Sequence, residues 1–167
     1  EKVIYSRVFC SRDNSPPLKL LLDFLKSKGQ IPLVPKMDPA ALDEWAWVHI
    51  SLGYHRERKP IQVVCLRDQG TYKSDFDKEK SQFLHMLSIY DDEEGQVVQA
   101  CVRQARFIVS TRMVETDMTE EGYDFNGWIL EFFQENCTGI VQVDGKGFFS
   151  PKGDLVIDME FFDSPEI

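Results

Sequence analysis

Six segments of this chain have the residue pattern of β-strands. Each is rich in β-branched and aromatic residues, and the breakers Gly, Pro, Ser, Asn and Asp separate them. Several alternate hydrophobic and polar positions, as expected for a strand with one buried side. The predicted strands are Val3–Cys10, Trp45–Tyr54, Pro60–Asp68, Arg106–Glu115, a segment that starts at Val141, and Asp154–Phe162.

Between these segments, hydrophobic residues recur at the spacing of one helix face. The first stripe has leucines at positions 18, 21, 22 and 25, and we expect Ser15 to cap this helix and Gly29 to end it. Three further stripes predict three further helices. They are Phe76, Phe83, Leu84 and Leu87; Val97, Val98, Cys101 and Val102; and Phe125, Trp128, Ile129, Phe132 and Phe133.

The predicted elements follow the order β-α-β-β, two helices, β-α-β-β. This order indicates a single α+β domain over residues 1–167, with a mainly antiparallel sheet and the helices mostly on one face. Its halves would be 1–70 and 105–162, joined by a helical segment at 74–104.

The repeated order also predicts an internal duplication. An offset of 94 residues places Gly147 on Gly53 and Phe148 on Tyr54, and it matches further apolar positions of the two hairpins. In topology alone, the paired units resemble the duplicated modules of small-molecule-binding GyrI-like domains. No motif in this chain carries site residues over from that family.

The segment Val141–Asp158 contains Gly145-Lys146-Gly147, which raises the question of a phosphate-binding loop. Such a loop needs G-x-x-x-x-G-K-[ST] between a strand and a helix, whereas another predicted strand follows here. The residues Pro151, Lys152 and Gly153 are typical of a turn. We therefore expect a β-hairpin, with Gly145 and Gly147 permitting a bend.

Side chains that alternate along a strand point to opposite faces of the sheet. In the second predicted strand, Trp45, Trp47 and His49 would share one face, opposite Ala46, Val48 and Ile50. The same reasoning places other aromatic and polar side chains of the remaining strands together. If the helices cover one face, the candidate binding residues on the other face are Trp45, Trp47, His49, Tyr5, Arg7, Arg112 and Asp144.

Aromatic residues and arginine dominate the energy of many binding surfaces. We therefore expect a non-catalytic binding domain for a small ligand or a protein partner. The main competing interpretation is that the tryptophans belong to the core. One alternative is an enzyme in which His49 and a nearby carboxylate act as acid and base, and a Cys65–His49 pair is also open. A structural role, including formation of a homodimer, is a third.

The formal net charge of −9 argues against non-specific nucleic-acid binding, which needs a basic surface. It is compatible with a cationic ligand or a basic protein partner, including a basic protein that this chain would inhibit. No apolar run is long enough to span a membrane, and the first residues lack the profile of a signal peptide.

The four cysteines form no C-x-x-C pair, and each lies in or beside an apolar segment. We expect free, largely buried thiols, which fits a cytoplasmic protein. No clustered Cys or His predicts a metal site, and no dinucleotide or hydrolase motif predicts a cofactor or a catalytic nucleophile.

Overall fold

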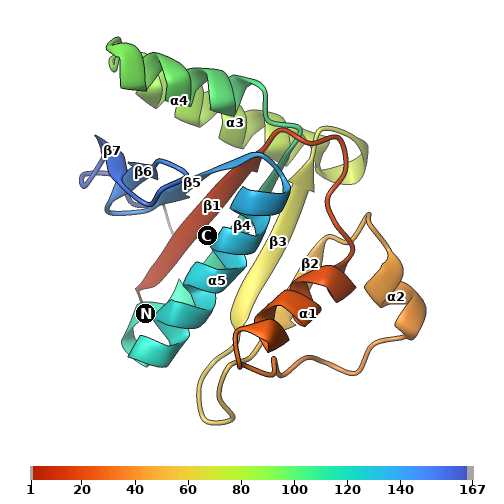
Figure 1. Ribbon diagram of the computed structural model, residues 1–167. Coiled ribbons are helices and arrows are strands. Elements are labelled where there is room, and N and C mark those ends of the chain that lie inside the picture. Colours follow the sequence, from red (N-terminus) through yellow and green to blue (C-terminus); the bar gives the residue numbers. More distant parts are fainter. Residues whose placement is uncertain (1, 165–167) are drawn as a thin grey trace.

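The computed structural model describes residues 2–164, which form one antiparallel sheet of seven strands with helices packed against it (Figure 1). The strands lie in the order β2-β3-β4-β1-β5-β6-β7. Their bounds are β1 Val3–Cys10, β2 His49–Leu52, β3 Ile61–Arg67, β4 Phe107–Val114, β5 Gly139–Val143, β6 Gly147–Phe149 and β7 Leu155–Asp158.

The helices follow the predicted stripes. Figure 1 shows α3 and α4 side by side across one end of the sheet, while α5 lies along the central strands. The α-helices are α1 Leu18–Ser27, α2 Pro39–Asp43, α3 Lys73–Leu87, α4 Glu93–Arg103 and α5 Glu120–Asn136, and the 3-10 helices are η1 Gly70–Tyr72 and η2 Glu115–Asp117.

The α+β class and the antiparallel sheet are confirmed, and the bounds of β1 are those predicted. The two expected halves are interleaved, because β4 pairs with β3 on one side and with β1 on the other. The second half therefore contributes a strand between two strands of the first. This arrangement does not establish an internal duplication, which stays a prediction.

The helices cover both faces of the sheet, not mostly one face as the sequence suggested. Along β1, Val8 and Cys10 join a core with α1 and α5, whereas Phe9 joins a second core with α3 and α4. On the adjacent strand β4, Val109 likewise belongs to the first core and Ile108 to the second. At one end of the sheet, the central strands are apolar on both faces, so both faces must be covered. The helices α3 and α4, within residues 73–103, form the second layer.

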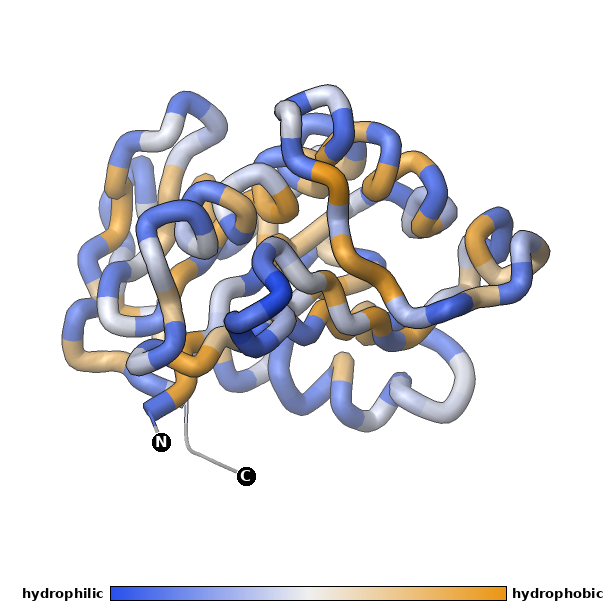
Figure 2. The backbone as a smooth tube through the Cα atoms, turned by 90° about the horizontal axis from the view of Figure 1, so that it is seen from below, coloured by the Kyte–Doolittle hydropathy of each residue, from blue (hydrophilic) through white to orange (hydrophobic). Residues whose placement is uncertain are grey.

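Hydrophobic and hydrophilic residues alternate at short intervals along the backbone (Figure 2), as expected for elements with one buried side. Leu21, Leu25 and Phe132, from the predicted helix stripes, are all buried, and so is Ile157 in β7. Ser15 does not cap α1, which starts after Pro17; its hydroxyl donates to the carbonyl of Trp45 instead.

The segment around Gly147 is a hairpin, as predicted, because β6 pairs with β7 and no helix follows. Gly147 has a φ of +137°, and a Cβ built there would lie 1.8 Å from the carbonyl oxygen of Ile157. Gly153, in the turn, has a φ of +90° with nothing within 4 Å of such a Cβ. Both glycines are therefore needed for a positive φ. Of the two, only Gly147 is also needed because the backbone of β7 lies too close for a side chain.

Alanine substitutions at Gly147 and Gly153 test the geometry of the hairpin. Gly153→Ala should cost about 1–2 kcal/mol of unfolding free energy, the strain of a positive φ alone. Gly147→Ala adds a clash with backbone, and overpacking typically costs a further ~1–3 kcal/mol. Urea denaturation of both variants would measure the difference. Equal losses would show that the close approach of β6 and β7 at Gly147 is wrong.

Candidate functional site

Three rows of side chains cross one face of the sheet and change from apolar to polar along the strands. The strand register aligns Leu66, Ile108, Phe9 and Ile140 in the first row, which lies in or against the core under α3 and α4. The second row is Val64, Ser110, Arg7 and Gln142. The third is Gln62, Arg112 and Tyr5, and the backbone N–H of Asp144 bonds the Tyr5 carbonyl beside it.

A cleft of about 470 Å³ lies where the cover by α3 ends, above the second row. Its floor comes from the sheet, its wall from α3 and η1, and its inner end from β1 and the segment after β7. The lining residues are Tyr5, Arg7, Val64, Leu66 and Ser110 on the sheet, Tyr72, Asp75, Lys78, Glu79 and Gln82 on the wall, and Ser164.

At the inner end of the cleft, the buried guanidinium of Arg7 is held by four side chains. Its Nη1 donates to Gln142 Oε1 at 2.7 Å and to Asp144 Oδ1 at 2.8 Å. Its Nη2 donates to Ser164 Oγ at 2.6 Å, and its Nε pairs with the Glu79 carboxylate. A buried charge needs this degree of pairing to be tolerated.

The Arg7 cluster joins parts of the chain that are far apart in sequence. Asp144 also accepts from the backbone N–H of Ser164 at 2.9 Å, and Gln142 donates to Asp144 at 2.9 Å. The Phe83 ring of α3 lies 4.8 Å from the Arg7 guanidinium carbon. One side chain thus fixes β1, β5, α3 and the segment after β7 to one another, which indicates a structural role for Arg7.

Other polar groups of the cleft are uncommitted. The side chains of Ser110, Lys78 and Gln82 form no hydrogen bond or ion pair with any of residues 2–164. Tyr72 on the wall is 42% exposed, and Tyr5 on the floor is half-buried. The cleft therefore combines a rigid, internally satisfied end with a floor and wall that can bond to another molecule.

The structure brings five of the seven sequence-predicted residues onto this face. Tyr5 and Arg7 line the cleft, Asp144 holds Arg7 from behind, and Arg112 lies exposed beside Tyr5. His49 is in register with Val64, at the edge of the sheet, and its Nε2 lies 2.6 Å from Gln62 Oε1. No carboxylate among the described residues contacts His49.

Trp45 and Trp47 lie elsewhere, because β2 starts only at His49. In the segment before β2, the guanidinium of Arg67 binds the carbonyls of both tryptophans. Trp47 is 6% exposed and packs against Phe133 in the α1–α5 core, as the core interpretation expected. Trp45 is 39% exposed. The shared face predicted for Trp45, Trp47 and His49 is therefore wrong.

The cleft residues on α3 and η1 were not identified from the sequence. One signal was present, since the stripe of Phe76, Phe83 and Leu87 fixes which side of α3 meets the sheet. Residues that flank this stripe, such as Glu79 and Gln82, must then lie at the border of the contact. The missing information was that α3 packs on the same face as Tyr5 and Arg7.

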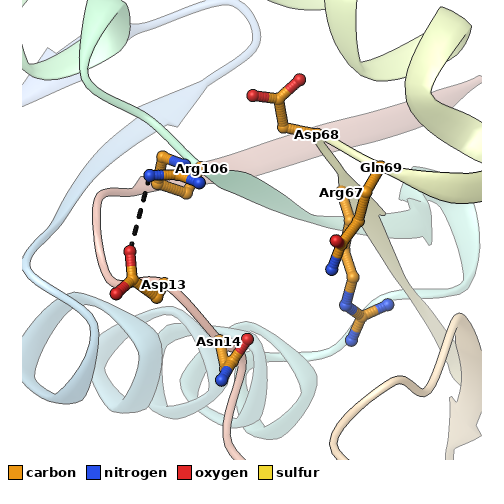
Figure 3. Close-up of a pocket in the computed structure, with 6 residues that line it drawn as sticks. All are labelled: Asp13, Asn14, Arg67, Asp68, Gln69 and Arg106. Atoms are coloured by element: carbon orange, nitrogen blue, oxygen red, sulfur yellow. Dashed lines mark hydrogen bonds and ion pairs between the residues drawn. The ribbon is translucent and has the colours of Figure 1, made fainter.

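A smaller polar cavity of about 130 Å³ lies at the end of β3 (Figure 3). It is lined by Asp13, Asn14, Arg67, Asp68, Gln69 and Arg106. Its charged groups have partners in the chain: Arg106 Nη1 lies 3.5 Å from Asp13, and Lys73 lies 3.0 Å from Asp68. Arg67 turns away from Asp68 in Figure 3 and holds the tryptophan carbonyls. This cavity is the weaker candidate.

The proposed Cys65–His49 pair is not formed. Cys65 belongs to the α1–α5 core, while its neighbour in the strand, Val64, faces the cleft and is in register with His49. Burial raises the pKa of the Cys65 thiol to about 12, although Arg67 and Ser15 oppose the shift. A thiol with such a pKa is a poor nucleophile near neutral pH.

No protein-family model, curated protein or solved structure matches this chain. Within residues 2–164, no helix is long and apolar enough to cross a membrane, and no group of three or more His, Cys, Asp or Glu could hold a metal ion.

The structural role of the Arg7 cluster can be tested by comparing substitutions at Arg7 and at Arg112. Arg112 lies in register with Tyr5 on the same face and has no polar partner among the described side chains. Arg7→Met should lower the free energy of unfolding by about 3–5 kcal/mol, because Asp144 and Glu79 lose their counter-ion. Arg112→Met should change it by about 0.5 kcal/mol or less. Urea denaturation would measure both. A small loss for Arg7→Met would show that the cluster does not hold the fold together.

Proposed function

We propose that this chain is a non-catalytic binding domain that takes a small ligand in the cleft between α3 and the sheet. The observation that carries the proposal is that some polar groups of the cleft have partners among the described residues and others have none. The cluster around Arg7 is satisfied by the chain itself, whereas Ser110, Lys78 and Gln82 are not. A few uncommitted polar groups among apolar lining residues are typical of a small-molecule site.

The volume of about 470 Å³ is that of a ligand-sized pocket. Small-molecule sites commonly measure about 300–1,000 Å³ and are concave and mostly apolar, with few polar groups. Here Val64 and Leu66 supply the apolar floor, and the rings of Tyr5 and Tyr72 lie on the sheet and the wall. These groups favour a ligand with a planar, apolar body.

The charges of the lining favour a ligand without net charge. Arg7 and Lys78 contribute two positive charges, and Asp75 and Glu79 contribute two negative ones. The net charge of −9 belongs to the chain as a whole and is not concentrated in the cleft. We therefore expect a neutral aromatic molecule whose hydroxyl or amide group bonds to Ser110 or Gln82.

The enzyme alternative receives less support. A general base needs a proton to accept and a group that orients it, and catalytic histidines usually have a carboxylate for this purpose. The partner of His49 is Gln62, and His49 does not line the cleft. We therefore place binding, not acid–base chemistry, on this face.

Neutral aromatic fragments such as phenols and aryl amides should bind the chain and raise its melting temperature, because a ligand of the native state alone stabilises that state. Tyr72→Ala should weaken this binding at least about tenfold, the effect of ~1.4 kcal/mol of lost stacking and apolar contact. Ligand-observed NMR and thermal shift would measure the two effects.

Tyr123→Ala is the matched control, since Tyr123 is 45% exposed and Tyr72 is 42% exposed, but only Tyr72 lines the cleft. The control should bind the fragments as the unchanged chain does. Ser110→Phe, which fills the floor of the cleft, should abolish binding. Fragments that bind all three variants equally, or no binding by any fragment, would contradict a site in this cleft.

A further inference from the structure

Two cysteines meet where β1 and α5 end. Cys10 is the last residue of β1, and Cys137 is the residue that caps α5. The backbone N–H of Ser11 donates to the carbonyl of Cys137 at 3.2 Å, and Cys10 is in register with Gly139 of β5. The Cys10 thiol donates to the carbonyl of Val8 at 3.5 Å, and the thiols of Cys10 and Cys137 lie close enough for each to shift the pKa of the other. Both side chains belong to the α1–α5 core.

The other two cysteines are separated from this pair. Cys65 lies on β3, and β4 runs between β3 and β1, so the backbones are two strand spacings, or ~10 Å, apart. Disulfides need Cα atoms within about 7 Å of each other. Cys101 lies on α4, against the core on the opposite face. Of the four cysteines, Cys10 and Cys137 are the pair whose segments are joined by a backbone hydrogen bond, from Ser11 to Cys137.

The two thiols of the pair have different environments. Burial raises the pKa of Cys10, and the neighbouring Cys137 thiol raises it further. The neighbouring Cys10 thiol lowers the pKa of Cys137; burial opposes this shift, and the nearby positive charge of Arg12 supports it. Cys137 is therefore the better thiolate, and Cys10 is the neighbouring thiol that can resolve an oxidised Cys137.

We propose that Cys10 and Cys137 form a dithiol that hydrogen peroxide converts into an intramolecular disulfide. The Cys137 thiolate attacks one peroxide oxygen, the O–O bond breaks, and sulfenic acid and hydroxide form. The Cys10 sulfur then attacks the Cys137 sulfur, the S–O bond breaks, and a second hydroxide leaves. The two thiol protons convert the hydroxides to water, so the two sulfurs are oxidised and one peroxide is reduced to two waters.

Access to the buried pair comes through the last turn of α5. Cys137 is followed by exposed Thr138, a non-glycine residue with a φ of +50°. The exposed Arg12 holds this turn by donating to the carbonyl of Asn136 at 2.6 Å. Helix ends open locally at lower free energy than the rest of a fold. Opening of this turn would let a peroxide molecule reach Cys137, which is 0% exposed in the closed form, without unfolding of the sheet.

The test starts from the fully reduced chain, which has four free thiols. After treatment with hydrogen peroxide, the remaining thiols are alkylated in denaturant and the peptides are mapped by mass spectrometry. We expect one cross-link, between the peptides of Cys10 and Cys137, and full alkylation of Cys65 and Cys101. The cross-linked chain should also denature at higher urea, and reductant should reverse the shift, because the disulfide restrains the unfolded chain.

Cys10→Ser and Cys137→Ser should each abolish the cross-link, while Cys65→Ala should keep it. The map of the unchanged chain does not depend on the folding of these variants. Four alkylated thiols after peroxide, sulfinic acid at Cys137 without a cross-link, a cross-link that involves Cys65, or a dimer on a non-reducing gel would each overturn the proposal.

Discussion

The buried guanidinium of Arg7 sets the arrangement of one whole face of this protein. It lies where the apolar row of Phe9, Ile108 and Ile140 gives way to polar side chains. A positive charge at that border must be neutralised within the chain, and Asp144 and Glu79 do so from β5 and α3. The need to pair this charge therefore fixes the distance at which α3 lies over the sheet.

The cleft follows from that arrangement. Phe76, Phe83 and Leu87 hold α3 on the apolar row, and the Arg7–Glu79 pair holds it at the start of the polar rows. Beyond that point the sheet has little cover, and Val64, Ser110 and Tyr5 form the cleft floor. The polar network and the open site are thus two results of one change in side-chain polarity along β1, β3 and β4.

Much of the fold could be predicted from the sequence because the local patterns are strong. The alternation in Val3–Cys10 and the leucine stripe of α1 specify their elements without help from the rest of the chain. The side to which each helix packs is different, since it depends on long-range pairing. Phe9 and Val8 are equally apolar, so β1 alone does not show that one face meets α5 and the other α3.

The candidate site could also be predicted only in part. Strand periodicity placed Tyr5, Arg7, Arg112 and Asp144 on one face because each lies in or directly after a regular strand. It misplaced Trp45 and Trp47, because β2 starts only at His49 and the segment before it is held by the side chain of Arg67, which binds both tryptophan carbonyls. A contact between a side chain and distant backbone carbonyls leaves no periodic signal in the sequence.

The strand β1 carries both proposed activities of this chain, on opposite faces. Arg7 points toward the cleft and α3, whereas Cys10, three residues later, points toward α5. The cleft lining includes no residue of α1 or α5, and both cysteines belong to the α1–α5 core. Ligand binding and thiol oxidation therefore depend on different layers of packing. A coupling between them would have to pass through the backbone of β1, where Ser6 and Val8 are held in register with β4 and β5 on both sides. A strand paired on both edges is the least deformable part of such a sheet, so we expect each site to work whether or not the other is occupied or oxidised.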